Sequence, residues 1–333
     1  MNRHVLITGS SGFVGSNLID FLQQKNFSVI GLDCCPSKFV EPNYFIKTDI
    51  RDENTLREIL KEYKPCAVFH LAAISTIQRG QTNPQDTWSV NFGGTRALLD
   101  AVNFAGLNNT KIFFASTDKV YGVLPTGADS YTEEMPLCPI NTSPYDCSKA
   151  AADQLVQTAN NTYVLRFCNL YGPYDTNKSR IVPATIITLL DNRANRIYGG
   201  ASQRAILNRY KDKDGVVRDF YRDMLYIDDL CKALANLVNK TLETNLPEKI
   251  FNFGVGTPNS MKDVITKINI FMGNVTRPPK VNIVPTTNEL IRQSVNSSRA
   301  QNFLNFCPTT SLDDGLRQTI EWWKNIIKTD KWW

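Results

Sequence analysis

Short apolar runs alternate with longer amphipathic stretches over the first half of the chain. The runs lie at residues 4–9, 28–33, 66–73, 111–117 and 162–167. Near-continuous apolar runs of this length are typical of parallel strands that are buried on both faces, and the stretches between them are long enough for crossover helices. The alternation therefore predicts an α/β fold with a doubly wound parallel sheet.

The pattern changes after residue 170 to polar loops that are rich in proline and interrupted by helical pieces. We expect residues 1–170 to form the domain that carries the parallel sheet, and residues 171–333 to form mainly a smaller, mixed domain over the ligand. The run "IFNFGVG" is a candidate strand returning to the main sheet, so a segment of about 222–255 is assigned to the first domain. A final helix is expected after Ser311, a suitable N-cap residue.

The charged residues are scattered along the chain. Of the 333 residues 21% are charged, the formal net charge is +5, and the lysines and arginines form no cluster. Without a concentrated basic patch, the sequence gives no sign of a nucleic-acid partner. No apolar run reaches the roughly 18 residues of a membrane span, so no membrane partner is expected. A site for an anionic small molecule is enough to account for the basic excess.

The eight cysteines lack the paired short spacings of a zinc site or a disulfide scaffold. We therefore expect reduced thiols in the core or in loops, and no bound metal. Met1 to His4 lead directly into an apolar run, without the charged and apolar regions of a signal peptide. The expected compartment is the cytoplasm.

A glycine-rich turn follows the first predicted strand. In "ITGSSGFVGSNL", Gly9, Gly12 and Gly15 stand between an apolar run and a helical stretch that contains Phe13 and Val14. Glycines permit a tight turn and a close approach of backbone to a pyrophosphate, while a helix N-terminus offers free N–H groups to an anion. The first two glycines are one residue further apart than in the usual fingerprint. The context nevertheless predicts a Rossmann-type dinucleotide cradle formed by these five residues.

An acidic residue ends the second predicted strand. Asp33 lies about 20 residues beyond the glycines, where a carboxylate can accept hydrogen bonds from the adenosine ribose and would repel a 2′-phosphate. This position favours NAD over NADP as the cofactor. Further cofactor contacts are expected on the adenine side and in a small-residue loop that lets backbone approach the cofactor; they are Asp49, Ile50, Leu71, Ala72 and Ala73.

The run at 111–117 ends in three different functional groups. Thr117, Asp118 and Lys119 supply a hydroxyl, an acid and an amine in successive positions. They stand at the carboxyl end of a strand, where open α/β sheets bind ligands. If the strand continued regularly, the side chains of Asp118 and Lys119 would point to opposite faces. Both reach one ligand only if the chain leaves strand geometry at Thr117 or Asp118.

A tyrosine and a lysine lie four residues apart in another helical stretch. Ser143 is a suitable N-cap with Pro144 at the first helical position, which places Tyr145 and Lys149 on one helix face. The pKa of a phenol is ordinarily about 10, but a nearby ammonium and a positive nicotinamide favour the phenolate. The pair can then take a proton from an alcohol while hydride leaves its carbon. Such pairs also occur by chance on plain helix surfaces.

Together these motifs carry a family resemblance. The glycines, Asp33, "STDKVYG", the pair of Tyr145 and Lys149, "LRFCNLYGP" and "RDMLYIDDL" resemble the extended short-chain dehydrogenase/reductase family that acts on sugar nucleotides. The similarity continues to "DDGLRQTIEWWK" near the end of the chain. The resemblance implies a Rossmann domain with bound NAD, a smaller C-terminal domain that holds a nucleoside-diphosphate sugar, and a homodimer.

The resemblance also implies roles for single residues. Thr117 matches the residue that hydrogen-bonds the sugar O4, Tyr145 the base that takes the O4 proton, and Lys149 the residue that binds the nicotinamide ribose. Asp118 matches a general acid for loss of water. Lys119 stands where dTDP-glucose dehydratases have glutamate, and is either the base at C5 or a bystander. The substrate contacts are assigned to Ser75, Thr76, Thr117, Asn169 and Arg222.

One departure from the family lies just before Arg222. The family normally reaches this arginine within a few residues of "RIYGG", whereas here residues 201–221 intervene. An insertion of this length is often a functional or mobile loop. It also makes Arg218 a rival for the role of Arg222 in gripping the nucleotide part of the substrate.

Three functions compete. The first is an NAD-dependent nucleoside-diphosphate-hexose 4,6-dehydratase that yields a 4-keto-6-deoxy sugar nucleotide, linked to UDP or dTDP. The second is a nucleotide-sugar epimerase, which needs only the hydroxyl and the phenol. Asp118 discriminates between them, because the amide found there in some epimerases cannot protonate departing water. The third is an inactive NAD-binding interaction protein, against which the complete set of Thr117, Tyr145 and Lys149 argues.

Overall fold

The computed structural model describes residues 3–140, 143–190, 206–211, 214–273, 280–283 and 290–328. A seven-stranded sheet lies at the centre of this part of the chain, in the order β12-β6-β5-β4-β1-β2-β3, with all pairings parallel. Its strands are β1 (His4–Thr8), β2 (Ser28–Asp33), β3 (Tyr44–Lys47), β4 (Ala67–His70), β5 (Lys111–Thr117), β6 (Thr162–Phe167) and β12 (Ile250–Phe253). The five apolar runs are five of these strands, so the predicted doubly wound parallel sheet is confirmed.

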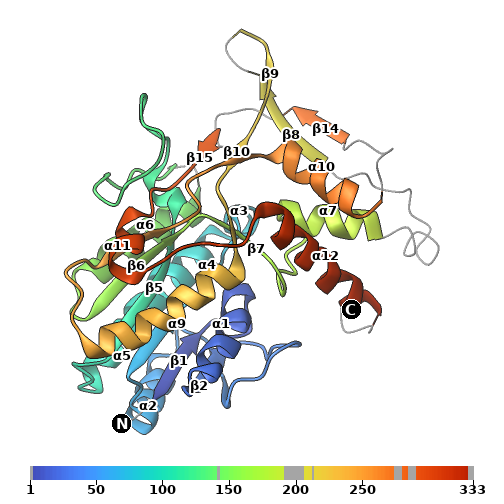
Figure 1. The fold of residues 1–333 in the computed structure, drawn as a ribbon. Coiled ribbons are helices and arrows are strands. Elements are labelled where there is room, and N and C mark those ends of the chain that lie inside the picture. The colour runs from blue at the N-terminus through green and yellow to red at the C-terminus, as the bar shows by residue number, and fades with distance from the viewer. Residues whose placement is uncertain are drawn as a thin grey trace.

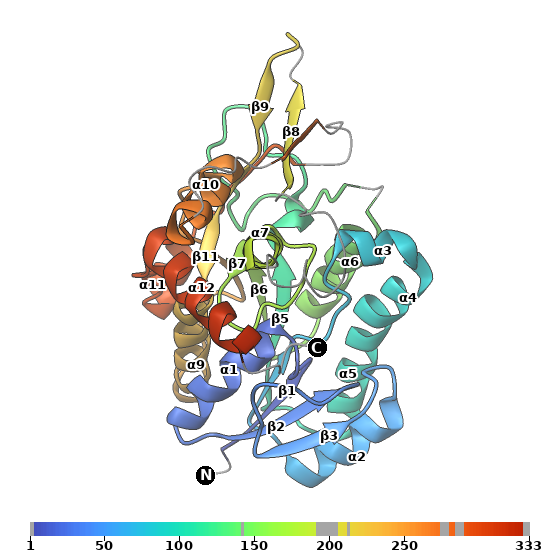
Figure 2. The same cartoon turned by 90° about the vertical axis from the view of Figure 1, so that its right-hand side faces the viewer.

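Helices cover both faces of the sheet. In β1, Val5 and Ile7 belong to the core that includes residues of α1 (Phe13–Gln24) and α9 (Ile227–Glu243), whereas Leu6 belongs to the core beneath α2 (Glu53–Tyr63) and α5 (Gly94–Phe104). Successive side chains of a strand point to opposite faces, and here both faces are buried. Figure 2 shows a helical layer on either side of the strands. Burial on both faces explains why the strands are continuous apolar runs.

Helix α6 (Pro144–Gln157) lies beside α5 and is contacted by a group of short elements. These are α3 (Ile77–Thr82), α4 (Pro84–Trp88), the π-helical turn η1 (Ser89–Gly93) and the 3₁₀ turn η2 (Asp118–Tyr121). Of these elements η2 directly follows β5, and α6 itself contacts that strand. They therefore bring the predicted catalytic residues to the same end of the sheet.

The chain beyond β6 forms a smaller, mixed part. Its short strands are β7 (Asn169–Tyr171), which pairs with β11 (Met224–Tyr226), and β10 (Tyr221–Arg222), which lies between β13 (Asn259–Ser260) and β15 (Arg292–Gln293). Helices α7 (Ile181–Leu190), α10 (Met261–Phe271) and α12 (Leu312–Lys328) share a second core around the buried Trp323. The hydroxyl of Ser311 accepts the Asp314 N–H at 3.1 Å, as expected of the N-cap of α12.

The candidate returning strand is β12, which pairs with β6 and is covered by α11 (Ser298–Leu304). The central sheet thus takes its last strand from the second half of the chain. The division of the chain into domains at residue 170 stays a prediction.

The insertion before Arg222 forms a β-hairpin where it is described, rather than a loop. β8 (Ile206–Lys211) and β9 (Val217–Asp219) are antiparallel, and β8 also pairs with β14 (Lys280–Ile283). An ion pair of 2.6 Å joins Arg209 to Asp219 across the hairpin. Its turn includes Gly215, whose φ of +78° favours glycine. The hairpin projects from the top of the molecule in Figures 1 and 2; residues 191–205 and 212–213 lie outside the described part.

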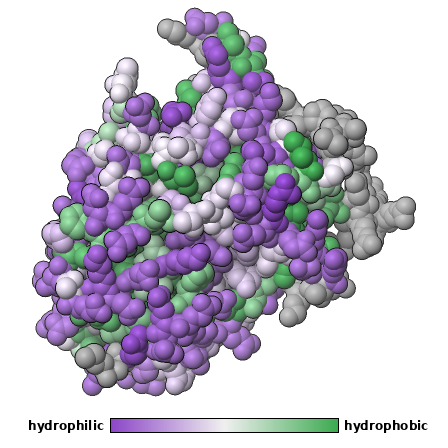
Figure 3. Space-filling view, viewed as in Figure 1, coloured by the Kyte–Doolittle hydropathy of each residue, from purple (hydrophilic) through white to green (hydrophobic). Residues whose placement is uncertain are grey.

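The molecular surface seen in Figure 3 is mostly hydrophilic, with apolar residues in small groups. In the described ranges, no helix has both the length and the apolar character that a membrane crossing requires. All eight cysteines are free thiols, of which Cys168 and Cys231 are buried.

Candidate active site

A cleft of about 1350 Å³ lies at the carboxyl ends of the central strands, between the sheet and the smaller part. A single ligand typically occupies roughly 300–1,000 Å³, so the cleft has room for two. Every site residue named from the sequence lines this one cleft: Gly9, Gly12, Phe13, Val14, Gly15, Asp33, Asp49, Ile50, Leu71, Ala72, Ala73, Ser75, Thr76, Thr117, Asp118, Lys119, Tyr145, Lys149, Asn169 and Arg222.

The glycine turn between β1 and α1 is shaped for an anion. Gly12 is the N-cap of α1, and the first turn has neither a side-chain cap nor an acidic residue, so its N–H groups are available to a ligand. Gly9 has a φ of +72°. A Cβ at Gly15 would lie 2.3 Å from the Gly9 carbonyl oxygen, which shows how closely the helix packs on the turn. The cradle therefore fits the diphosphate of a dinucleotide.

Backbone hydrogen bonds fix the carboxylate of Asp33 at the end of β2. Its Oδ2 accepts the Ser11 N–H at 3.1 Å, and its Oδ1 accepts the Cys35 N–H at 3.2 Å. The side chain lines the cleft one strand away from the glycine cradle. This is the position from which an acid can bind the ribose hydroxyls of NAD.

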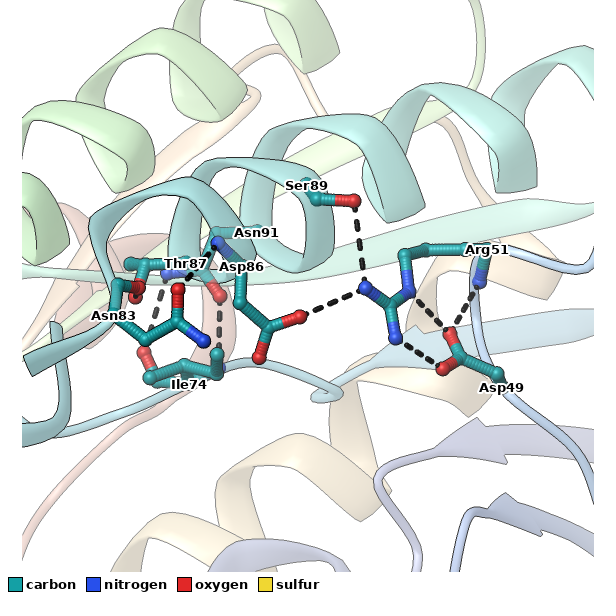
Figure 4. Close-up of polar contacts among 8 residues, drawn as sticks. All are labelled: Asp49, Arg51, Ile74, Asn83, Asp86, Thr87, Ser89 and Asn91. Carbon is teal, nitrogen blue, oxygen red and sulfur yellow. Dashed lines mark hydrogen bonds and ion pairs between the residues drawn. The ribbon is translucent and has the colours of Figure 1, made fainter.

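The adenine side of the cleft is crossed by an ion triad. Arg51 donates to Asp49 through Nε (2.9 Å) and Nη2 (2.6 Å), and through Nη1 to Asp86 of α4 at 2.8 Å (Figure 4). The hydrogen bonds from Arg51 lower the pKa of Asp49. The Asp49 carboxylate is thus paired with Arg51, and the adenine contact expected from this residue stays a prediction.

The loop after β4 is held by Asn91, which we did not identify from the sequence. Its side chain accepts the Ile74 N–H at 2.8 Å and donates to the Ile74 carbonyl at 3.2 Å and to the Ser148 hydroxyl at 3.0 Å (Figure 4 shows Asn91 beside Ile74). Residues Leu71 to Ala73 are thereby presented to the cleft. The sequence offers one signal for this role, because Asn91 is a polar residue on the buried side of a helical pattern.

The chain leaves strand geometry directly after Thr117. Thr117 is the last residue of β5, and Asp118 begins the turn η2, whose N-cap is Thr117 with its hydroxyl accepting the Lys119 N–H at 3.4 Å. Successive residues of a 3₁₀ turn do not point in opposite directions as they do in a strand. Thr117, Asp118 and Lys119 accordingly all line the cleft.

Asp118 is a buried acid, with only 2% of its surface exposed. Burial raises its pKa from 3.8 to about 6, against the opposing charges of Lys119 and Arg222 and with a further rise from Asp223. A carboxyl group with a near-neutral pKa is suited to general acid catalysis. Asp118 can therefore hold a proton under conditions in which an exposed aspartate cannot.

Tyr145 and Lys149 lie on α6, whose N-cap is Ser143. Burial raises the pKa of Tyr145, while Arg180 and a hydrogen bond with Thr117 lower it. Burial lowers the pKa of Lys149 to about 7, opposed by the charge of Asp153. Lys149 donates to the Ala115 carbonyl at 2.5 Å, which anchors the amine to β5. The phenol of Tyr145 and the hydroxyl of Thr117 therefore lie within hydrogen-bonding reach of each other.

The substrate side of the cleft contains Arg222 and Asn169. Arg222 is buried and lines the cleft, whereas Arg218 is an exposed residue of β9 that is absent from its lining. The Asn169 Nδ2 is buried and has no hydrogen-bond partner within the described residues, as expected of a group that awaits a ligand. Thr76 lines the cleft but also caps α3 by accepting the Arg79 N–H at 3.2 Å.

Two further residues of the cleft region were not identified from the sequence. Arg180 lines the cleft and acts on the pKa of Tyr145. Gln293, fully buried in β15, donates to Asp118 Oδ2 at 3.0 Å. Neither position carries a motif that sequence reasoning could use, because each depends on chain segments that meet only in the folded protein.

The cleft lies on a doubly wound sheet, and it contains both an anion cradle at the first helix and the pair of Tyr145 and Lys149. Together these features define a Rossmann-type enzyme that uses a dinucleotide. Comparison with protein families makes this specific. Residues 5–254 match the model of the NAD dependent epimerase/dehydratase family, and the chain belongs to that family. Its cofactor is NAD, for which the cradle and Asp33 provide the fitting groups.

Individual relatives cover nearly the whole chain. A dTDP-glucose 4,6-dehydratase of Haemophilus influenzae is 29% identical over 96% of this chain and 97% of its own. A UDP-glucose 4-epimerase of Mycolicibacterium smegmatis is 29% identical over 96% and 98%. Among solved structures, a dTDP-glucose 4,6-dehydratase of Streptomyces venezuelae with NAD bound has a TM-score of 0.81 at 25% identity, covering 99% of this chain and 98% of that one.

Proposed function

We propose that the protein is an NAD-dependent nucleoside-diphosphate-hexose 4,6-dehydratase that acts on a dTDP- or UDP-linked hexose. The observation that carries this proposal is Asp118, a buried acid with a pKa of about 6 that lines the cleft next to Thr117 and Lys119. An epimerase has no use for a proton donor at this position. A dehydratase requires one, because the departing C6 hydroxyl must be protonated.

The first half of the reaction oxidises C4. The hydroxyl of Thr117 and the phenol of Tyr145, which share a hydrogen bond, bind the sugar O4. Tyr145 takes the O4 proton, and Lys149, anchored to the Ala115 carbonyl, holds the nicotinamide ribose. NAD, which the glycine cradle, Asp33 and Lys149 would hold, would supply the hydride acceptor for C4 and the hydride donor for C6.

The second half removes water. A ketone at C4 makes the C5 proton acidic, so a neutral Lys119 can take that proton while a protonated Asp118 gives its own to the C6 hydroxyl. This pair of states has the same net charge as the ion pair, from which it differs by one proton transfer. Water leaves C6 in this elimination. Return of the proton from Lys119 to C5, with a hydride supplied to C6, would then give the 4-keto-6-deoxy sugar.

The relatives support both members of this reaction class. Several are named dTDP-glucose 4,6-dehydratases, while one is named a UDP-glucose 4-epimerase. An epimerase is therefore the second candidate. An epimerase would use the same Thr117 and Tyr145 but would not need Asp118 as a proton donor. The buried acid therefore favours the dehydratase.

The test is incubation with dTDP-, UDP-, CDP- and GDP-hexoses followed by mass measurement. We expect a product lighter by one water from a dTDP- or UDP-hexose. In Asp118→Asn, loss of water should stop while C4 oxidation persists, so that reduced cofactor accumulates on the enzyme and absorbs as NADH. Asp129→Asn, the same change at an exposed acid outside the cleft lining, is the matched control. An unchanged mass with altered ring stereochemistry would establish the epimerase instead.

A further inference from the structure

One buried amide contacts both the acid and the amine of the site. Gln293 Nε2 donates to Asp118 Oδ2 at 3.0 Å, and Gln293 Oε1 accepts from Lys119 Nζ at 3.5 Å. Gln293 and Asp118 are both buried, so the contact between them is shielded from water, whereas Lys119 is half-buried at the cleft. The side chains of two adjacent residues on one turn are thus bridged by a third residue that is far away in the sequence.

Backbone contacts hold Gln293 in place. In β15 it lies opposite Arg222 of β10, and the Asp223 N–H donates to the Gln293 carbonyl at 3.0 Å. The buried carboxylate of Asp223 accepts the Val295 N–H at 3.3 Å, which ties down the chain on the other side of Gln293. The segment that carries the bridging amide is therefore fixed to the strand that carries Arg222.

We propose that Gln293 is the positioning residue of the elimination step, holding Asp118 and Lys119 side by side as one acid–base pair. This inference rests on the proposed dehydratase function. The turn η2 brings both side chains to the cleft, but a lysine has four rotatable bonds and the turn alone does not direct its amine toward the acid. The amide supplies that direction.

The chemistry of a primary amide suits this task. It has donors on one end and an acceptor on the other, so it can serve a carboxylate and an ammonium at once. In the structure the amide nitrogen faces Asp118 Oδ2 and the amide oxygen faces Lys119 Nζ. A glutamate of the same shape would place a negative charge against Asp118. A leucine would remove the amide contact from both groups and leave Asp118 with its hydrogen bond from Thr117 at 3.3 Å.

The pKa of the Asp118 carboxyl is a direct measure of the contact that Gln293 makes with it. The titratable groups that act on it, or on which it acts, are Lys119, Tyr131, Tyr145, Cys168, Arg222 and Asp223. Hydrogen bonding to the charged form of an acid lowers its pKa. Gln293→Leu should therefore raise the pKa of Asp118, and Gln293→Glu should raise it further by repulsion.

The experiment compares wild type with Gln293→Leu, Gln293→Glu and the control Ser294→Ala. Ser294 is the buried neighbour whose hydroxyl donates to the Gly256 carbonyl at 3.2 Å, away from the acid–base pair. Three readouts are taken on the full chain with NAD bound: the ¹³C titration of the Asp118 carboxyl, the single-turnover rate of C4 oxidation seen as NADH, and the rate of water loss by mass.

In both Gln293 variants we expect water loss to fall about tenfold or more, the effect of removing a hydrogen bond to a charged group. C4 oxidation should change by less than about threefold, as for a substitution away from the reacting atoms. Ser294→Ala should leave all three readouts unchanged. The inference is overturned if both half-reactions fall in parallel, or if the Asp118 titration is the same in wild type and in either folded variant.

These outcomes are distinguishable from failure of the proposed function. If the wild type releases no water from any sugar nucleotide, the dehydratase proposal is wrong, whatever the variants do. If the wild type releases water and the variants titrate and react as it does, only the role of Gln293 is wrong. Should Gln293→Leu fail to fold, Gln293→Glu keeps the size of the side chain and still tests the bridge.

Discussion

Replacing Asp118 with asparagine is expected to stabilise the folded protein at neutral pH while it stops the loss of water. The carboxyl is 2% exposed, and burial raises its pKa from 3.8 to about 6. This rise in the pKa means that ionising Asp118 lowers the free energy of unfolding by about 3 kcal/mol. Asparagine removes the charge and retains an oxygen that can accept from Gln293.

The sign of the pH dependence follows from proton binding. An unfolded Asp118 releases its proton near pH 4, whereas the folded protein keeps it until about pH 6. Between these values the folded state binds more protons, so the free energy of unfolding of the wild type falls as the pH rises, and becomes level above about pH 6. Relative to wild type, Asp118→Asn should gain nothing near pH 4 and about 3 kcal/mol at pH 7 and above.

The assay is urea denaturation of both proteins at pH 4.5, 6.0 and 7.5, each with the same concentration of NAD. The midpoint of Asp118→Asn should move above that of wild type as the pH rises. Asp129→Asn removes an exposed acid and should show no such divergence. A difference in stability that is the same at all three pH values, or a less stable variant at pH 7.5, would refute the argument that burial of a charged Asp118 carries this cost.

Three further substitutions test other parts of the site. Tyr145→Phe removes the group that takes the O4 proton and should slow C4 oxidation by roughly 10²–10⁴-fold in a single-turnover NADH assay; a rate equal to wild type would exclude it as the base. Gly15→Ala places a Cβ 2.3 Å from the Gly9 carbonyl oxygen and should weaken NAD binding in calorimetry, whereas Gly93→Ala, whose Cβ has no neighbour nearer than 4.0 Å, should not. Arg51→Ala breaks the ion pairs with Asp49 and Asp86, each contributing up to about 1 kcal/mol. If this triad closes the cleft over bound NAD, the cofactor should dissociate faster from the variant, and its dissociation rate should depend less on salt; an unchanged salt dependence would count against that role.

Local patterns in the sequence were sufficient to predict the central sheet and the cofactor cradle. Buried strands and a glycine turn leave signals within a few residues, and so do the N-cap Ser143 and the spacing of Tyr145 and Lys149. The turn at Asp118 was harder, because an apolar run followed by Gly122 shows that a strand ends but not where. A Cβ at Gly122 would lie 1.8 Å from the Cys138 carbonyl oxygen, so the turn is shaped by a distant segment.

The rest of the site depends on contacts between segments far apart in the sequence. Gln293 reaches Asp118 across 175 positions, and nothing near either residue predicts the contact. The hairpin of the insertion depends in the same way on pairing with β14. Asn91 leaves a fainter signal, since an amide in an otherwise apolar helix face must find a partner, but its partner Ile74 is identified only by the fold.

The central claim is that this chain removes water from a sugar nucleotide with transfer of hydride from C4 to C6. The most direct test is turnover of a dTDP- or UDP-hexose that carries deuterium at C4, with the product examined by mass and by NMR. The account predicts a product lighter by one water that carries the deuterium on C6. A product of unchanged mass with the deuterium still at C4 would contradict it.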